Sequence, residues 1–152
     1  MIKLVCVGKI KDPNLKALVF DYQSKISHYH KIDIIEVKDE PIKDNVKDVL
    51  DIEADRILSK INSEDYVILL DLHGKPLDSI EFANKIDKIF LSNSKICFVI
   101  GGSLGLGQNI INRANFRLKL SDMTFLHQMT RLILLEQIYR SFKILNNETY
   151  HK

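Results

Sequence analysis

Four of the six glycines in this 152-residue chain lie within seven positions, directly after an apolar segment. That segment, Ile96–Ile100, runs straight into Gly101-Gly102-Ser103-Leu104-Gly105-Leu106-Gly107, and a polar, helix-like stretch follows at 108–114. A short continuous apolar run is typical of a strand buried on both faces of a parallel sheet. Glycines after such a strand let the chain turn sharply and let a ligand approach the backbone. Ligands of open α/β sheets bind at the carboxyl ends of strands, so the pattern indicates either a small-molecule site or only a tight turn.

Two common glycine motifs do not fit this loop. A P-loop requires Lys and then Ser or Thr after the last glycine, but Gln108-Asn109 follow Gly107. A dinucleotide fingerprint requires a third glycine where Ile110 stands. The loop therefore gives little support to nucleoside triphosphate or NAD binding.

The rest of the chain alternates strand-like and helix-like segments. Continuous apolar runs such as Val67-Ile68-Leu69-Leu70 favour buried strands, and the apolar residues of 45–61 recur at helical spacing. Strands are expected at 2–8, 32–37, 66–72, 95–100 and 116–120, and helices at 14–30, 45–61, 79–91, 108–114 and 128–145. The alternation predicts one α/β domain over residues 1–152, a mostly parallel sheet with helices on both faces. The last helix is apolar on many sides, which predicts burial in the core or against a second subunit.

Composition excludes several classes of protein. Hydrophobic residues make up 45% and charged residues 28%, as in ordinary soluble domains. No window approaches the roughly 20 apolar residues of a membrane span, and the N-terminus lacks the features of a signal peptide. Cys6 and Cys97 both lie in apolar runs, which predicts buried free thiols and a cytoplasmic location. No cysteine and histidine cluster has metal-ligand spacing, so no metal site is expected.

Charge is distributed unevenly along the chain. The net charge is +2, but residues 106–152 carry +4 and the remainder carries −2. Four of the five arginines lie in this C-terminal part. The planar fork of arginine suits phosphate, so the excess favours a polyanionic partner, although a solvated surface would have the same composition.

Three motifs taken together carry a family resemblance. They are Leu70-Asp71-Leu72-His73-Gly74-Lys75, the glycine loop with its preceding Ile100, and Leu120-Ser121-Asp122-Met123-Thr124-Phe125-Leu126-His127-Gln128 followed by Arg131. The chain also ends in Tyr150-His151-Lys152. In this order and spacing they resemble the ribosomal RNA large subunit methyltransferase H family, small single-domain members of the SPOUT class of methyltransferases.

This resemblance implies a fold and a cofactor. The implied fold is SPOUT-like, with the C-terminal part threaded through a loop as a trefoil knot, a rare exception among proteins. The implied cofactor is S-adenosylmethionine, held by three loops of the knot. Carried over residue by residue, its contacts fall at Leu70, Gly101, Leu120, Ser121, Asp122, Met123, Thr124 and Phe125. The family usually has proline where Leu126 stands, and loss of the fixed φ is expected to loosen the entry to the last helix.

The resemblance further implies methylation of N3 of a pseudouridine in 23S ribosomal RNA on assembled ribosomes. The N3 proton must leave, and His127 is the candidate acceptor. Arg131, four residues on, is expected to orient the target nucleotide, and Tyr150 and His151 are candidate RNA contacts. SPOUT proteins commonly dimerise, so a homodimer is expected, in which one subunit would supply RNA contacts to the other's cofactor. Two alternatives stay open: a SPOUT enzyme acting on transfer RNA, and a non-enzymatic RNA-binding or nucleotide-sensing module.

Overall fold

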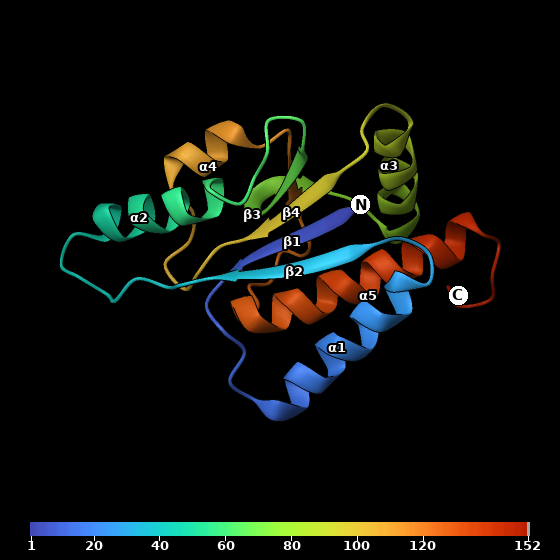
Figure 1. Ribbon diagram of the computed structural model, residues 1–152, viewed down its shortest axis with the longest axis horizontal. Coiled ribbons are helices and arrows are strands. Elements are labelled where there is room, and N and C mark those ends of the chain that lie inside the picture. Colours follow the sequence, from blue (N-terminus) through green and yellow to red (C-terminus); the bar gives the residue numbers. More distant parts are fainter. Residues whose placement is uncertain (152) are drawn as a thin grey trace.

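The computed structural model describes residues 1–151, which form alternating strands and helices (Figure 1). The strands are β1 (Ile2–Val7), β2 (Ile32–Val37), β3 (Tyr66–Pro76), β4 (Ile96–Ile100) and β5 (Phe116–Lys119). The helices are α1 (Pro13–Ser27), α2 (Val46–Leu58), α3 (Ser79–Ser92), α4 (Gln108–Arg113) and α5 (His127–Leu145). All ten segments expected from the sequence are present. The clearest difference is β3, which continues to Pro76 instead of ending at Leu72.

Local capping explains where two of the helices begin. The Asp12 side chain accepts hydrogen bonds from the backbone N–H groups of Asn14 and Leu15, and α1 therefore starts at Pro13. Helix α3 starts with a capping box, in which Asp78 and Glu81 each accept a hydrogen bond from the other's backbone N–H.

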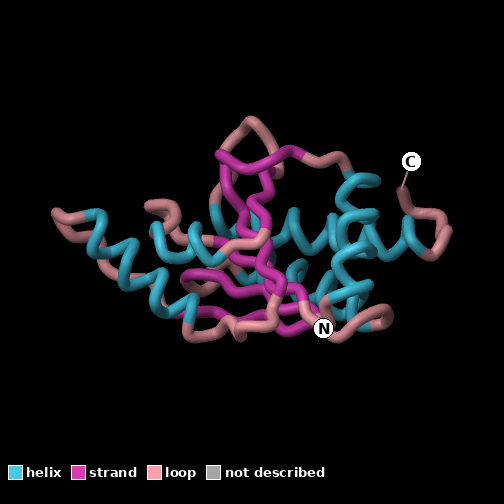
Figure 2. The backbone as a smooth tube through the Cα atoms, turned by 90° about the horizontal axis from the view of Figure 1, so that it is seen from above, coloured by secondary structure: helices cyan, strands magenta, loops and turns pink. Residues whose placement is uncertain are grey.

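The strands form one sheet in the order β2-β1-β4-β3-β5, and every pairing is parallel. The sequence predicted a mostly parallel sheet, and in the described residues it is entirely parallel. Helices α1, α3 and α5 cover one face, and α2 and α4 cover the other (Figure 1). Seen from above, the strands run side by side through the middle of the molecule (Figure 2). Both faces are buried, which explains the continuous apolar runs.

Alternate residues of β1, β2, β3 and β4 supply the two cores. In β1, Leu4 and Cys6 face the core under α1, α3 and α5, while Val5 and Val7 face the core under α2 and α4. The expected buried free thiols are confirmed: Cys6 and Cys97 are unpaired and buried, and burial raises the pKa of each to about 12. No helix in the described chain is both long and apolar enough to span a membrane.

The connection from β5 to α5 crosses the end of the sheet. Strand β5 is an edge strand, and α5 begins only eight positions after its last residue, at His127. Four residues into α5, Arg131 already bonds Glu36 at the carboxyl end of β2, on the opposite edge. Residues 120–126 therefore pass the carboxyl ends of the intervening strands, next to the glycine loop that leaves β4. From there α5 runs to the far end of the molecule, close to α1 and α3 (Figure 1).

Candidate functional site

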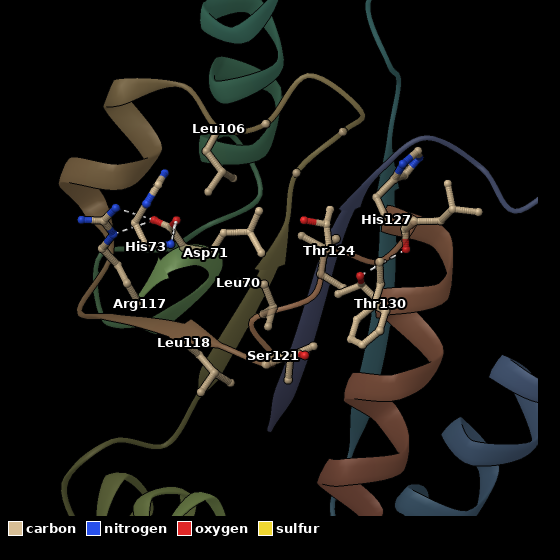
Figure 3. A pocket seen from close by; sticks show the side chains of 18 of the residues that line it. Leu70, Asp71, His73, Leu106, Arg117, Leu118, Ser121, Thr124, His127 and Thr130 are labelled. Atoms are coloured by element: carbon tan, nitrogen blue, oxygen red, sulfur yellow. Dashed lines mark hydrogen bonds and ion pairs between the residues drawn. The ribbon is translucent and has the colours of Figure 1, made fainter. Parts of the chain in front are cut away.

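A pocket of about 630 Å³ opens at the carboxyl ends of β3, β4 and β5 (Figure 3). This volume is in the usual range for a small-molecule site. Three backbone segments form its walls. The first wall has Leu70, Asp71, Leu72 and His73; the second has Ile100, Gly101, Gly102, Ser103, Gly105 and Leu106; the third has Leu118, Leu120, Ser121, Met123, Thr124, Phe125, Leu126 and His127. Ile111, Arg117 and Thr130 complete the lining.

The first wall is a bulge in β3. Leu70 pairs with Leu118, and Lys75 pairs with the same residue, so residues 71–74 leave the ladder between them. The buried Asp71 braces this bulge, because one carboxylate oxygen accepts the His73 N–H at 2.9 Å and the other accepts the Arg117 guanidinium at 2.6 Å. A Cβ on Gly74 would lie 2.6 Å from the Arg117 carbonyl oxygen. The bulge is therefore held against β5 by both charge and close backbone contact.

The second wall is the glycine loop. The Gly105 N–H donates to the Gly102 carbonyl at 3.2 Å, and Gly105 has a φ of +106°, which glycine adopts without strain. A Cβ on Gly101 would lie 2.6 Å from the Gly105 carbonyl oxygen. Glycine at position 101 is thus required by the loop itself, and a larger residue there would displace the loop.

The third wall is the connection that crosses from β5 to α5. The Ser121 hydroxyl accepts the Met123 N–H at 3.0 Å and closes a turn. Leu126 is the N-cap residue of α5, its side chain makes no capping hydrogen bond, and its φ of −54° lies within the range that proline would fix. Asp122 does not line the pocket: its side chain is 92% exposed and forms an ion pair with Lys119.

His127 is the histidine of this third wall, at the first turn of α5 (Figure 3). Burial lowers the pKa of its imidazole, and the Arg131 cation lowers it further, while the carboxylates of Glu53 and Asp39 act in the opposite direction. The net effect is downward. The ring is therefore predominantly neutral at pH 7, with a free nitrogen lone pair that can accept a proton.

Arg131 lies behind the pocket wall and is only 1% exposed. Its guanidinium donates to the Glu36 carboxylate at 2.7 Å and to the Gly8 carbonyl at 3.2 Å. Glu36 also accepts the Ile10 N–H at 3.3 Å. These bonds fasten the start of α5 to β2 and to the loop after β1, so a direct contact between Arg131 and a nucleotide would require the ion pair to break.

Tyr150 and His151 lie at the other end of α5. The Tyr150 hydroxyl donates to the Glu136 carboxylate at 3.1 Å, and the His151 Nδ1 lies 3.1 Å from the Arg140 guanidinium. Glu136 and Arg140 follow His127 by nine and thirteen residues, so they lie roughly 14 and 20 Å along α5 from it at ~1.5 Å per residue. Neither Tyr150 nor His151 lines the pocket of its own chain.

Several lining residues were not identified from the sequence. The Asp71–Arg117 brace was missed because the two residues are 46 positions apart and meet only through the bulge in β3. Leu106, Leu118 and Thr130 carry no distinctive signal, since an apolar or hydroxyl side chain at a strand or helix end has many structural roles. In residues 1–151, no group of three or more His, Cys, Asp or Glu side chains is arranged to hold a metal ion.

Comparison with known proteins agrees with the resemblance seen in the sequence. Residues 1–151 match the family described as "Predicted SPOUT methyltransferase". The chain is 48% identical over 157 aligned residues to a putative ribosomal RNA large subunit methyltransferase H of Methanococcus vannielii, and the alignment covers 99% of each protein. It is 46% identical to the ribosomal RNA large subunit methyltransferase H of Acetivibrio thermocellus and 48% identical to that of Clostridium botulinum, with the same coverage.

Proposed function

The chain belongs to the SPOUT methyltransferase family, and we propose that it methylates N3 of a pseudouridine in 23S ribosomal RNA, on the assembled ribosome, with S-adenosylmethionine as methyl donor. The names of its relatives supply the substrate class, the ribosomal RNA of the large subunit. The single domain and the parallel α/β sheet agree with this family, and a ribosomal substrate implies a cytoplasmic location.

The pocket carries the proposal. Of the eight positions that the family resemblance assigns to the cofactor, seven line it: Leu70, Gly101, Leu120, Ser121, Met123, Thr124 and Phe125. The eighth, Asp122, stands in the same turn with its side chain outward. Apolar side chains such as Leu70 and Leu118 suit an adenine ring, and loop backbone groups suit polar ends of a ligand. When bound, S-adenosylmethionine supplies an already activated methyl group, so the protein has mainly to position the base and remove its proton.

We propose that residues 1–152 form one domain and that the C-terminal part of this domain is a trefoil knot. The supporting feature is the crossing of residues 120–126 past the carboxyl ends of the strands, at the end where the glycine loop leaves β4. Ordinary folds avoid connections that cross at one end of a sheet. A thread of this kind would fix the third pocket wall against the second.

Labelled methyl transfer tests the function directly. The protein is incubated with S-adenosylmethionine carrying a labelled methyl group and with ribosomes that lack the modification, with isolated 23S RNA and with transfer RNA. We expect label in 23S RNA of assembled ribosomes, mapped by nuclease digestion and mass spectrometry to N3 of one pseudouridine. Label in transfer RNA would point to a different SPOUT enzyme, and cofactor binding without transfer to any RNA would contradict the proposal.

His127 is the proposed acceptor of the N3 proton. Its pKa is lowered, so the reactive neutral form is lost only as the pH falls below the usual histidine range of about 6.5. Single-turnover rates should therefore rise with pH, with a midpoint below about 6.5, and level off near neutrality. We expect His127→Ala to keep cofactor binding, to lose roughly 10²-fold in rate and to lose this rise.

His73→Ala is the matched control for this experiment, because His73 lines the same pocket but is exposed. This variant should keep the parental pH profile. If His127→Ala also keeps the parental rate and profile, the imidazole has only a structural role, and the proton leaves by another route.

We propose that the protein acts as a homodimer, in which the tail of one subunit serves the pocket of the other. Exposed apolar side chains surround the pocket mouth, with Leu126 and Met123 each 74% exposed and Leu72 51% exposed. Such a rim is typical of a contact surface. Tyr150 and His151 are held by Glu136 and Arg140 and do not line their own pocket, so a contact with the RNA at a pocket would come from the second copy. Arg131 would act here by positioning α5 through Glu36.

Mixed dimers test this arrangement. Gly101→Val displaces the loop of the second wall, and His151→Ala removes the tail imidazole, so each variant alone should be nearly inactive. In dimers reassembled from equal amounts of both, about a quarter of all sites pair an intact pocket with an intact tail, because a two-fold interface makes the two subunits equivalent. We expect activity to return to that level. No recovery in mixed dimers confirmed by differential tags, or a monomer in sedimentation at micromolar concentration, would contradict the proposal.

A further inference from the structure

Three lysines that lie near one another have no carboxylate partner within the described residues. Lys75 lies at the end of β3, and Lys85 and Lys88 lie on α3. None of them takes part in an ion pair among residues 1–151. Other lysines without an ion pair occur elsewhere in the described chain, but these three lie together, since Lys75 and Lys88 both lower the pKa of Lys85 through their charge. We call Lys75, Lys85 and Lys88 the lysine row.

Contacts with the edge strand hold the row in place. The Lys85 Nζ lies 3.8 Å from the centroid of the Phe116 ring, at the start of β5. Lys88 follows Lys85 by three residues and so shares its face of α3. Lys75 is paired in register with Leu118, two residues along β5 from Phe116. The row therefore follows the β5 edge of the sheet.

The positive charge of the row is not neutralised locally. Partial burial lowers the pKa of Lys85, and the cations of Lys75 and Lys88 lower it further. Glu81, one helical turn before Lys85, already accepts the Asp78 N–H at 3.1 Å in the capping box. Asp87 lines a separate hollow with His30 and Phe90. Like charges held together without counter-charges repel one another, and a polyanion would relieve that repulsion.

The row is continuous with the mouth of the pocket. Lys75 directly follows the bulge 71–74, whose Leu72 and His73 line the pocket. An RNA strand that places a base in the pocket from this side would have its neighbouring phosphates beside Lys75 and then beside α3. Phosphate contacts of this kind position a nucleic acid without reading its sequence.

We propose that the lysine row binds the phosphate backbone of the RNA whose target base enters the pocket. This inference rests on the proposed function, since it takes ribosomal RNA as the partner. Lys85 and Phe116 fix the middle of the contact, and Lys75 connects it to the catalytic pocket. The row contributes to affinity for the ribosome and not to the methyl-transfer step.

A charge-matched pair of triple variants tests the row. The row variant combines Lys75→Gln, Lys85→Gln and Lys88→Gln in one protein. The control has the same net charge and combines Lys25→Gln, Lys43→Gln and Lys47→Gln. Each lysine replaced in the control forms an ion pair with a carboxylate outside the row. Binding to large ribosomal subunits is measured over a range of KCl concentrations. The slope of log K against log salt is negative, and each lost phosphate contact should reduce its magnitude by about 0.7–0.9. The row variant should therefore lose about 2.1–2.7 in magnitude, and the control much less.

Kinetics and a second variant complete the test. The row variant should show a raised KM for ribosomes, with kcat at saturation and S-adenosylmethionine affinity as in the parent. If Lys85→Gln lowers the melting temperature, a double variant with Lys75→Gln and Lys88→Gln replaces it, because both of these lysines are exposed. Its slope of log K against log salt should be smaller in magnitude than that of the parent by about 1.5. If the row variant has the same slope and KM as the control while the parent methylates ribosomes, the lysine row does not bind the RNA backbone, and the proposed function still stands. If the parent neither binds nor methylates ribosomes, the proposed function is wrong, and ribosomal RNA is then not the partner of the lysine row.

Discussion

The pocket depends on the parallel direction of the strands. Because they run parallel, the carboxyl ends of β3, β4 and β5 all lie at the same end of the sheet. Each strand end leads into a differently supported segment: a bulge braced by Asp71, a glycine loop, and a crossing connection fastened through α5. Together they enclose an apolar space edged by backbone groups, which is the general form of a small-ligand site.

Arg131 connects the fold to the chemistry without entering the pocket. Its ion pair with Glu36 fixes the first turn of α5, and its positive charge lowers the pKa of His127 one turn earlier. Burial is the larger cause of the lowered pKa of His127, and the buried cation of Arg131 adds to it. From the sequence alone, a four-residue spacing indicated two side chains directed at one substrate. In the structure His127 lines the pocket, whereas Arg131 is buried against Glu36, and this difference arises from how the start of α5 packs on the sheet.

Much of the fold could be predicted from the sequence because both faces of the sheet are buried. Runs such as Val67-Ile68-Leu69-Leu70 and Phe98-Val99-Ile100 admit few other structures, and the helices between them have clear spacing and capping residues. The strand order, the bulge in β3 and the Asp71–Arg117 brace could not be predicted, since they arise from contacts between distant residues. The same is true of the tail, which folds back so that Tyr150 is held by Glu136 in the middle of α5.

Amide hydrogen exchange with and without S-adenosylmethionine tests the cofactor pocket most directly, because it reports on backbone groups without altering any residue. Binding should slow exchange in three separate segments, near Leu70, in the loop 101–107 and in the connection 120–126, and should leave α1 and the hollow lined by His30 and Phe90 unchanged. Protection confined to one segment, or protection at that hollow in place of the strand ends, would contradict a cofactor site built from the three carboxyl ends.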